Sequence, residues 1–228
     1  MKKNIESIIA CPKCNGKLSS QKNELTCLKC EHIYKIVNKI PVFLDNLSYD
    51  EGSEESFRDR LKKNTKFFRV FKKIHSVLGP PDSNYFKKVD IKNSKVDFPI
   101  KEIIRENELI LNIGSSSRKI YPNAINLDIG LFENVDVVAD GKNLPFKDNS
   151  FDLVLIESVL EHVDEPERVI KESYRVLKSK GEIYISIPFV FVFHGSPSDF
   201  NRYTLNGLKK RLEIIGFKVK KYGIISGP

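Results

Sequence analysis

The second half of this 228-residue chain alternates apolar, β-branched runs of strand length with helical runs, and this alternation constrains the fold more than any other feature. The strand-like runs are ELILNIG, INLDI, VDVVAD, FDLVLIES, EIYISIPF and a last one, FKVKKYGII. The helical runs, PERVIKESYRVLKSKG and TLNGLKKRLEIIGF, stand between the later strands. Such alternation predicts a mostly parallel sheet covered by helices. Because ligands of open parallel sheets bind beyond the carboxyl ends of the strands, we expect the site residues there.

All four cysteines lie within the first thirty residues, as Cys11 and Cys14 in CPKC and Cys27 and Cys30 in CLKC. Each CxxC is a tight turn that aims two thiolates at one point, and two such turns complete a tetrahedron around zinc. A redox motif would need only one pair, and a reducing cytoplasm disfavours disulfides. We therefore predict a closed structural zinc site that folds this module and does no chemistry.

The sequence divides into three parts. Residues 1–45 are expected to form a small antiparallel ribbon around zinc, ending in the apolar tail IPVFL. Residues 46–82 are interpreted as a polar linker followed by a basic amphipathic helix, and residues 83–228 as the main α/β domain. The ribbon is too short to build a core of its own, so we expect it to depend on the metal.

The chain is basic, with a formal net charge of +8 and a sequence pI of about 9.2. This balance favours acidic partners such as nucleic acid, anionic lipid or phosphorylated small molecules. The basic helix at 57–73 would suit peripheral membrane contact or nucleic acid, but its phenylalanines favour packing on the main domain. No apolar run approaches the roughly 18 residues of a transmembrane segment, and the start lacks a signal peptide, so we expect a cytoplasmic protein.

Polar and small residues follow the ends of four successive predicted strands. Gly114 permits a close backbone approach, and the serines after it leave room for a ligand. Asp128 is placed to accept hydrogen bonds from a ribose diol. A single acid at a strand end is more often a solvated terminus or a helix cap, but four successive strand ends together predict a ligand site. The residues at these ends are Asn112, Gly114, Ser115, Ser116, Asp128, Asp140, Gly141, Glu157 and Ser158.

The order of these motifs resembles class I S-adenosylmethionine-dependent methyltransferases of type 11. LNIGSSS, NLDI, VVADGKNLPFKDNSFDLVL and ESVLEHVDEPERVIKESYRVLKSKGEIYISIPF follow one another, with LKSKG where LKPGG is usual. The resemblance implies a Rossmann-like sheet with helices on both faces. It also implies a seventh strand, for which the sequence after the sixth has no room, so we expect a fragment or a shortened end. The N-terminal ribbon is similar to Trm112-like modules, small proteins that activate partner methyltransferases.

The resemblance implies that the turn at Gly114 faces the methionine part of S-adenosylmethionine and that Asp128 takes the ribose hydroxyls. The acid of the usual acid-x-Gly-x-Gly loop is replaced by Asn112, whose carbonyl oxygen can still accept a hydrogen bond. The connection to Asp128 is too short for the usual helix. We still expect a working cofactor site. Its implied residues are Asn112, Gly114, Ser115, Ser116, Asp128, Ile129, Asp140, Gly141, Glu157 and Ser158.

The segment HGSPSDFNRYT after the fifth strand is similar to one in bacterial and archaeal methyltransferases, many linked to surface-polysaccharide synthesis. His194 is the candidate catalytic base, because an unshifted imidazole pKa lies near neutrality. Asp199, Arg202 and Tyr203 are candidate substrate-binding residues, and Arg202 suits a phosphate or carboxylate. In the alternative interpretation Asp199 and Arg202 pair only to fix the loop. His162 is interpreted as a helix-start residue beside the pocket rather than a base.

The sequence therefore predicts an enzyme that moves a methyl group from S-adenosylmethionine to an oxygen or nitrogen of a small-molecule or glycan-linked acceptor. One alternative is an RNA methyltransferase that grips phosphates through the ribbon and the basic helix. It is disfavoured, because ESVL stands where a catalytic NPPY-like tetrapeptide would be expected. A second alternative is a non-catalytic scaffold whose glycine loop no longer binds the cofactor.

Overall fold

The computed structural model describes residues 5–45, 103–104, 108–116, 121, 124–189 and 198–223. Residues 1–51 and 104–219 form one compact unit, to which all the helices and strands below belong. The predicted basic helix at 57–73 and the candidate base His194 lie outside the described residues.

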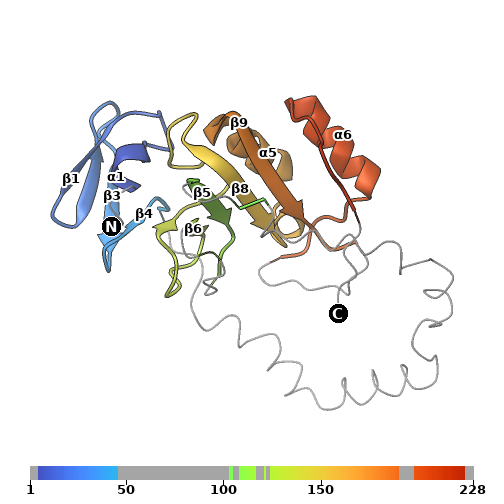
Figure 1. Ribbon diagram of the computed structural model, residues 1–228. Coiled ribbons are helices and arrows are strands. Elements are labelled where there is room, and N and C mark those ends of the chain that lie inside the picture. Colours follow the sequence, from blue (N-terminus) through green and yellow to red (C-terminus); the bar gives the residue numbers. More distant parts are fainter. Residues whose placement is uncertain are drawn as a thin grey trace, which may run out of the picture. The chain divides into compact units, whose positions relative to one another are not determined.

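One sheet runs through the described part of the chain (Figure 1). Its nine strands lie in the order β1-β2-β3-β4-β7-β6-β5-β8-β9. In sequence they are β1 (Leu18–Gln21), β2 (Glu24–Cys27), β3 (Ile33–Val37), β4 (Ile40–Val42), β5 (Ile110–Ile113), β6 (Ala124–Asp128), β7 (Val137–Val138), β8 (Phe151–Glu157) and β9 (Leu177–Ser186). The first five predicted strands of the main domain are confirmed, although VDVVAD supplies only the two-residue β7.

The strands β7, β6, β5, β8 and β9, which follow one another in the sheet, are all parallel, as the alternation of strands and helices predicted. From β5 the chain first moves to one side, through β6 and β7, and then to the other, through β8 and β9. The order of strands thus reverses between β5 and β8, and a crevice opens at such a point beyond the carboxyl ends of the strands. β5 and β6 are buried along their whole length, which agrees with their continuous apolar sequences.

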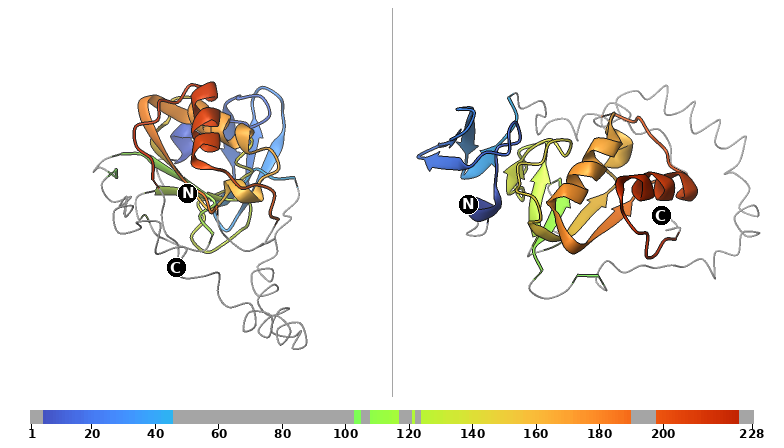
Figure 2. Two further views of the ribbon diagram at one scale, coloured as in Figure 1. Left: turned by 90° about the vertical axis from the view of Figure 1, so that its right-hand side faces the viewer. Right: turned by 90° about the horizontal axis from the view of Figure 1, so that it is seen from above.

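The ribbon is joined to this sheet rather than standing apart. Its strands β1 to β4 are antiparallel, but β4 also pairs in parallel with β7, with Val42 opposite Val138. Nearby, Ile9 forms an antiparallel bridge with Phe146. Ile9, Tyr34 and Phe146 lie in one continuous cluster of buried apolar side chains. Seen from above, the ribbon prolongs the sheet at the end opposite α6 (Figure 2, right).

Helix α5 (Pro166–Val176) begins with a proline in its first turn, where the missing N–H costs nothing. The sequence predicted that this helix continues to Gly181, but it ends at Val176 and β9 begins at the next residue. The physical reason is that Leu177 is buried and pairs with Phe151 of β8. The burial of one apolar side chain thus outweighs the helical propensity of the lysines that follow.

Helix α6 (Leu205–Ile215) packs on α5 and has the predicted cap: Thr204 Oγ1 accepts a hydrogen bond from Gly207 N at 3.1 Å. Gly216 ends the helix with a left-handed φ of 119°. The predicted last strand is wrong over residues 217–223, which adopt no strand. A strand needs a partner for its backbone, and no described strand lies beside this segment. None of the described helices has the length and hydropathy needed to cross a bilayer.

The shared core yields a stability prediction. Phe146 is 0% exposed and meets Phe151 edge to face, with ring centroids 4.9 Å apart. We expect Phe146→Ala to lower the free energy of unfolding by about 3–5 kcal/mol, measured by denaturant titration. Phe189→Ala, at a side chain 57% exposed, serves as the control and should change it by less than about 0.5 kcal/mol. Equal effects would contradict a core centred on Phe146.

Candidate functional site

The turn after β5 depends on a glycine. Gly114 has a φ of +72°, in the left-handed region that side chains rarely adopt. A Cβ added there would lie 2.2 Å from Val159 Cγ2, too close for any side chain. Gly114 N also donates to Leu127 O at 2.8 Å, which ties the turn to β6. The sequence predicted a close approach to the backbone at Gly114, and in the structure Val159 of the same chain makes this approach.

Asp128 joins the turn after β5 to the turn after β6. It ends β6 and is 9% exposed. Its Oδ2 accepts a hydrogen bond from Ser116 N at 2.8 Å, and its Oδ1 accepts one from Gly130 N at 3.0 Å. Each oxygen of a carboxylate has two lone pairs, so such a group can hold backbone amides and accept further donors as well. This arrangement fits the two hydroxyls of a ribose.

The side chain of Asn112 is buried in the interior of the sheet. Its Nδ2 donates to Asn126 Oδ1 at 3.1 Å, across the parallel register that sets the two residues side by side. Asn126 Nδ2 in turn donates to Asn134 O at 3.1 Å. Both asparagine side chains are buried. Asn112, which replaces the usual acid, thus belongs to a row of buried hydrogen-bonded polar groups below the turn.

The other predicted strand ends lie along the same edge. Asp140 Oδ1 accepts a hydrogen bond from Lys142 N at 2.8 Å, and a Cβ on Gly141 would lie 3.3 Å from Ile113 Cγ2 at the end of β5. Glu157 Oε1 accepts a hydrogen bond from Tyr121 Oη at 2.8 Å. Burial, followed by this bond, raises the pKa of Tyr121, so the phenol remains a donor. The structure thus brings the residues predicted for the cofactor together.

The segment 198–203 is fastened to the short helix η2 (Leu160–His162). Phe200 N and Asn201 N both donate to Glu161 O, at 2.7 and 3.2 Å. His162 Nδ1 makes a hydrogen bond with Ser198 O. Side chain and backbone contacts together fix this segment beside the end of β8. We call it the acceptor loop because the sequence predicts substrate-binding residues in it.

Asp199 and Arg202 form an ion pair inside the acceptor loop. Arg202 Nη2 donates to Asp199 Oδ2 at 2.7 Å, and its Nη1 binds both Asp199 Oδ1 and the backbone oxygen of Asn201. The Asp199 carboxylate raises the pKa of Arg202. Tyr203 is buried beneath Arg211, whose Cζ lies 5.3 Å from the ring centroid. These contacts agree with the alternative interpretation of the sequence, in which Asp199 and Arg202 pair to fix the loop. A substrate-binding role for Asp199, Arg202 and Tyr203 stays a prediction.

Glu161 was not singled out from the sequence. Its side chain is 0% exposed, and among the described residues neither carboxyl oxygen has a hydrogen-bond partner. A glutamate at the start of a helix is ordinarily a solvated residue, so the sequence carried no signal for this burial. Burial raises the pKa of Glu161.

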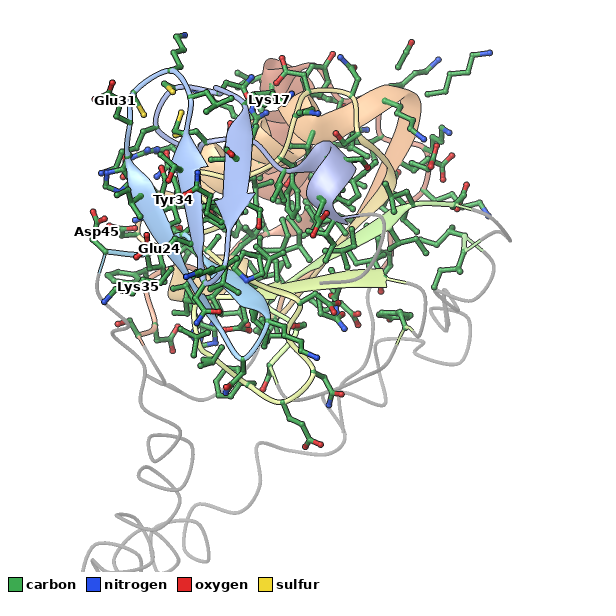
Figure 3. The ribbon with its side chains drawn as sticks, turned by 90° about the vertical axis from the view of Figure 1, so that its left-hand side faces the viewer. Lys17, Glu24, Glu31, Tyr34, Lys35 and Asp45 are labelled. Carbon is green, nitrogen blue, oxygen red and sulfur yellow. The ribbon has the colours of Figure 1, made fainter. Side chains whose placement is uncertain are left out.

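The four cysteines converge at one end of the ribbon, where their sulfur atoms are drawn in yellow near Glu31 (Figure 3). All four Sγ atoms lie within 4.8 Å of one another. Cys11 Sγ lies 3.7 Å from Cys30 Sγ, and Cys14 Sγ lies 3.4 Å from Cys27 Sγ. Four thiolates around zinc, each about 2.3 Å from the metal, are separated by roughly 3.8 Å. The cluster therefore fits one tetrahedral zinc ion.

Neighbouring groups orient the cysteine sulfurs. Tyr34, which is buried, has its Oη 3.1 Å from Cys11 Sγ (Figure 3). Lys29 N donates to Cys27 Sγ at 3.4 Å. Burial acts to raise the pKa of Cys27, but backbone N–H groups, together with the thiols of Cys14 and Cys30, outweigh it and lower the pKa to about 6. His32 Nε2 lies 3.3 Å from Asp45 Oδ1, so His32 is engaged outside the cluster.

Gly114→Ala should disrupt the turn, because the new Cβ meets Val159 and the backbone is left-handed. We expect a loss of at least about 2 kcal/mol in the free energy of unfolding. Adding Val159→Ala removes the clash but not the backbone strain, so the double variant should recover part of the loss. A double-mutant cycle with Val159→Ala alone measures that coupling. Strict additivity would show that the close contact is absent.

Removing zinc should weaken the sheet beyond the ribbon, because Phe43 N donates to Val138 O at 2.8 Å across the junction of β4 and β7. We expect a strong chelator to lower the melting temperature and to speed hydrogen exchange at Phe43. The amides between β8 and β9 are the internal control and should change least. A chain that melts identically with and without chelator would contradict a folding role for the metal.

Two family models match the chain. Residues 119–185 match the model described as "Methyltransferase domain", and residues 5–38 match "Trm112p-like protein". The first segment contains Asp128 and the strand ends of β6 to β8, and the second contains all four cysteines.

Curated relatives match over part of the chain. The "Ubiquinone/menaquinone biosynthesis C-methyltransferase UbiE" of Rickettsia prowazekii is 32% identical over 122 residues, 52% of this chain and 49% of that protein. The "Uncharacterized protein MJ1123" of Methanocaldococcus jannaschii is 49% identical over 51 residues, 22% of this chain and 25% of that protein. The chain thus spans about half the length of the curated methyltransferase, and less of the second relative.

Among solved structures, similarity is found to the complex between the Haloferax volcanii Trm112 methyltransferase activator and a methyltransferase. The identity is 19%, the TM-score 0.44, and the match covers 52% of this chain and 64% of that chain. A SAM-dependent methyltransferase from Archaeoglobus fulgidus gives 21% identity and a TM-score of 0.40, covering 48% of this chain and 60% of that chain. The resemblance inferred from the sequence is confirmed by the family models: a segment similar to Trm112p-like proteins precedes one similar to methyltransferase domains.

Proposed function

We propose that this chain is an S-adenosylmethionine-dependent methyltransferase. The observation that carries the proposal is the position of Asp128, which ends β6 at the carboxyl edge of the parallel strands, next to the reversal of strand order between β5 and β8. Its carboxylate is held by two backbone amides, and a carboxylate at this place is the group that suits a ribose diol. The methyltransferase family match over residues 119–185 supports the same conclusion.

When bound, S-adenosylmethionine supplies an electrophilic methyl group on a sulfonium. The chain's own residues then hold and orient the cofactor. Asp128 accepts the ribose hydroxyls, the turn from Gly114 to Ser116 faces the methionine part, and Asp140 with Gly141 flanks the adenine. Methyl transfer needs in-line attack, so the site contributes mainly by fixing the two reactants in that geometry.

The acceptor is proposed to be an oxygen or nitrogen of a small molecule or of a glycan-linked group. Support comes from the segment HGSPSDFNRYT, which is similar to one in methyltransferases linked to surface polysaccharides. His194 is the proposed base, needed where the attacking atom must lose a proton. The acceptor loop at 198–203 follows it in the chain and lies beside the end of β8.

A carbon acceptor is the second candidate. It is favoured by one observation, that curated relatives matching about half of this chain are named C-methyltransferases. A carbon nucleophile activated within the acceptor itself needs less help from a protein base than an alcohol does. The two candidates are therefore separated by His194→Ala, which should slow an oxygen acceptor strongly and such a carbon acceptor little.

Calorimetric titration with S-adenosylmethionine and S-adenosylhomocysteine tests the proposal. We expect binding by the zinc-loaded chain and a loss of about 10–100-fold in affinity for Asp128→Asn, because hydrogen bonds to charged groups contribute about 1.5–3 kcal/mol. Asp152→Asn is the matched control: Asp152 also accepts a backbone hydrogen bond, from Leu109 N at 2.9 Å, but lies at the amino end of β8.

The control variant should bind both ligands as the unmodified chain does. A folded, zinc-loaded chain that binds neither ligand would refute the proposal and leave the scaffold alternative. An equal loss for Asp128→Asn and Asp152→Asn would show that the effect arises from general destabilisation.

A further inference from the structure

The carboxyl group of Glu161, a residue of η2, is buried without the contacts that such a group requires. Neither of its oxygens is exposed, and neither has a hydrogen-bond partner among the described residues. Within the described part of the chain, His162 Nε2 lies 3.9 Å from Glu161 Oε1, which is beyond hydrogen-bonding distance. The backbone oxygen of the same residue is engaged, since Glu161 O accepts both Phe200 N and Asn201 N.

Among the described residues, three charged or titratable groups act on this carboxyl group. His162 belongs to η2, while Asp199 and Arg202 come from the acceptor loop. His162 Nδ1 makes a hydrogen bond with Ser198 O, and its Nε2 stays beyond hydrogen-bonding distance of Glu161. Arg202 is already paired with Asp199 through both of its terminal nitrogens. None of these three side chains thus makes a hydrogen bond to the Glu161 carboxyl group.

A carboxylate without partners in such a place would carry a large desolvation penalty, whereas the protonated acid would lack only its hydrogen bonds. Burial raises the pKa of Glu161, its own backbone N–H and the fields of His162 and Arg202 act to lower it, and Asp199 acts to raise it further. Geometry and electrostatics therefore agree that the arrangement described here suits the neutral acid.

We propose that Glu161 is a positioning residue that holds the acceptor loop in place while it is uncharged and loosens the loop when it ionises. An ionised Glu161 competes with Asp199 for Arg202 and repels the Asp199 carboxylate. Because the loop amides bond to the backbone oxygen of Glu161 itself, displacement of this residue also moves the loop. The inference rests on the proposed function only in assigning this loop to the acceptor side.

The sign of the pH dependence follows from linkage. The loop closed over a neutral Glu161 binds one proton more than the open loop, whose carboxyl has an ordinary pKa near 4.3. Between this ordinary pKa and the raised pKa of the closed state, each increase of one pH unit therefore favours the open loop by about tenfold. Above the raised pKa the effect levels off.

Hydrogen exchange at Phe200 and Asn201 in the full zinc-loaded chain, between pH 4.5 and 8.5, tests the proposal. After correction for intrinsic exchange, protection of these amides should fall with rising pH in the unmodified chain by at least about tenfold. In Glu161→Gln, which is neutral at every pH, protection should stay constant. His162 is retained in this variant, so the comparison changes the Glu161 carboxyl alone. Glu133→Gln, at an exposed residue, should behave as the unmodified chain does.

The same pH dependence in the unmodified chain and in Glu161→Gln would overturn the proposal. So would a loss of protection in Glu161→Gln at every pH, because that result would mean that the ionised carboxylate holds the loop. A carbon-13 NMR titration of the glutamate carboxyl groups in the unmodified chain needs no variant. It should show one carboxyl that titrates above the ordinary range, and its absence would also overturn the proposal.

Neither measurement requires a methyl acceptor or bound cofactor. A pH-dependent loop in a chain that fails to bind S-adenosylmethionine would refute the proposed function and leave this inference intact. Cofactor binding by a chain whose loop does not respond to pH would support the proposed function and overturn this inference.

Discussion

The carboxylate of Asp128 links the two turns on which the candidate site depends. Parallel strands leave their final carbonyl and amide groups without sheet partners, and at this edge the side chain of one strand end takes the amides of two turns. Gly114 lets the first turn approach Val159, and the Asn112–Asn126 pair fixes the register of the strands beneath it. The same group that fixes these turns is the one proposed to bind the cofactor, so a ligand would meet a preorganised acceptor.

The ribbon contributes to this site through the sheet. A small ribbon cannot bury enough apolar surface to be stable alone, and here it adds its last strand to the edge of the parallel strands and shares their core. β7, which the ribbon borders, pairs with β6, whose end carries Asp128. A closed zinc site outside the reaction can thus support the cofactor edge by holding β4 in place.

Local patterns were sufficient to predict some features and insufficient for others. The strands β5, β6 and β8, the cap at Thr204 and the convergence of four cysteines follow from alternation, capping chemistry and CxxC spacing, which act over a few residues. The pairing of Val42 with Val138 joins segments far apart in the sequence, and IPVFL showed only that the tail would be buried. The end of α5 depends on Leu177 meeting Phe151, and the burial of Glu161 depends on a loop nearly forty residues later. These contacts are tertiary, so the propensity and periodicity of the local sequence do not predict them.

Asp128 is proposed to hold the ribose of S-adenosylmethionine at the reversal of strand order. A crystal structure of the zinc-loaded chain with S-adenosylhomocysteine tests this most directly. We expect both ribose hydroxyls within hydrogen-bonding distance of the Asp128 carboxylate, while Ser116 N and Gly130 N keep their bonds to it. A ligand bound elsewhere, or a ribose turned away from Asp128, would contradict the account.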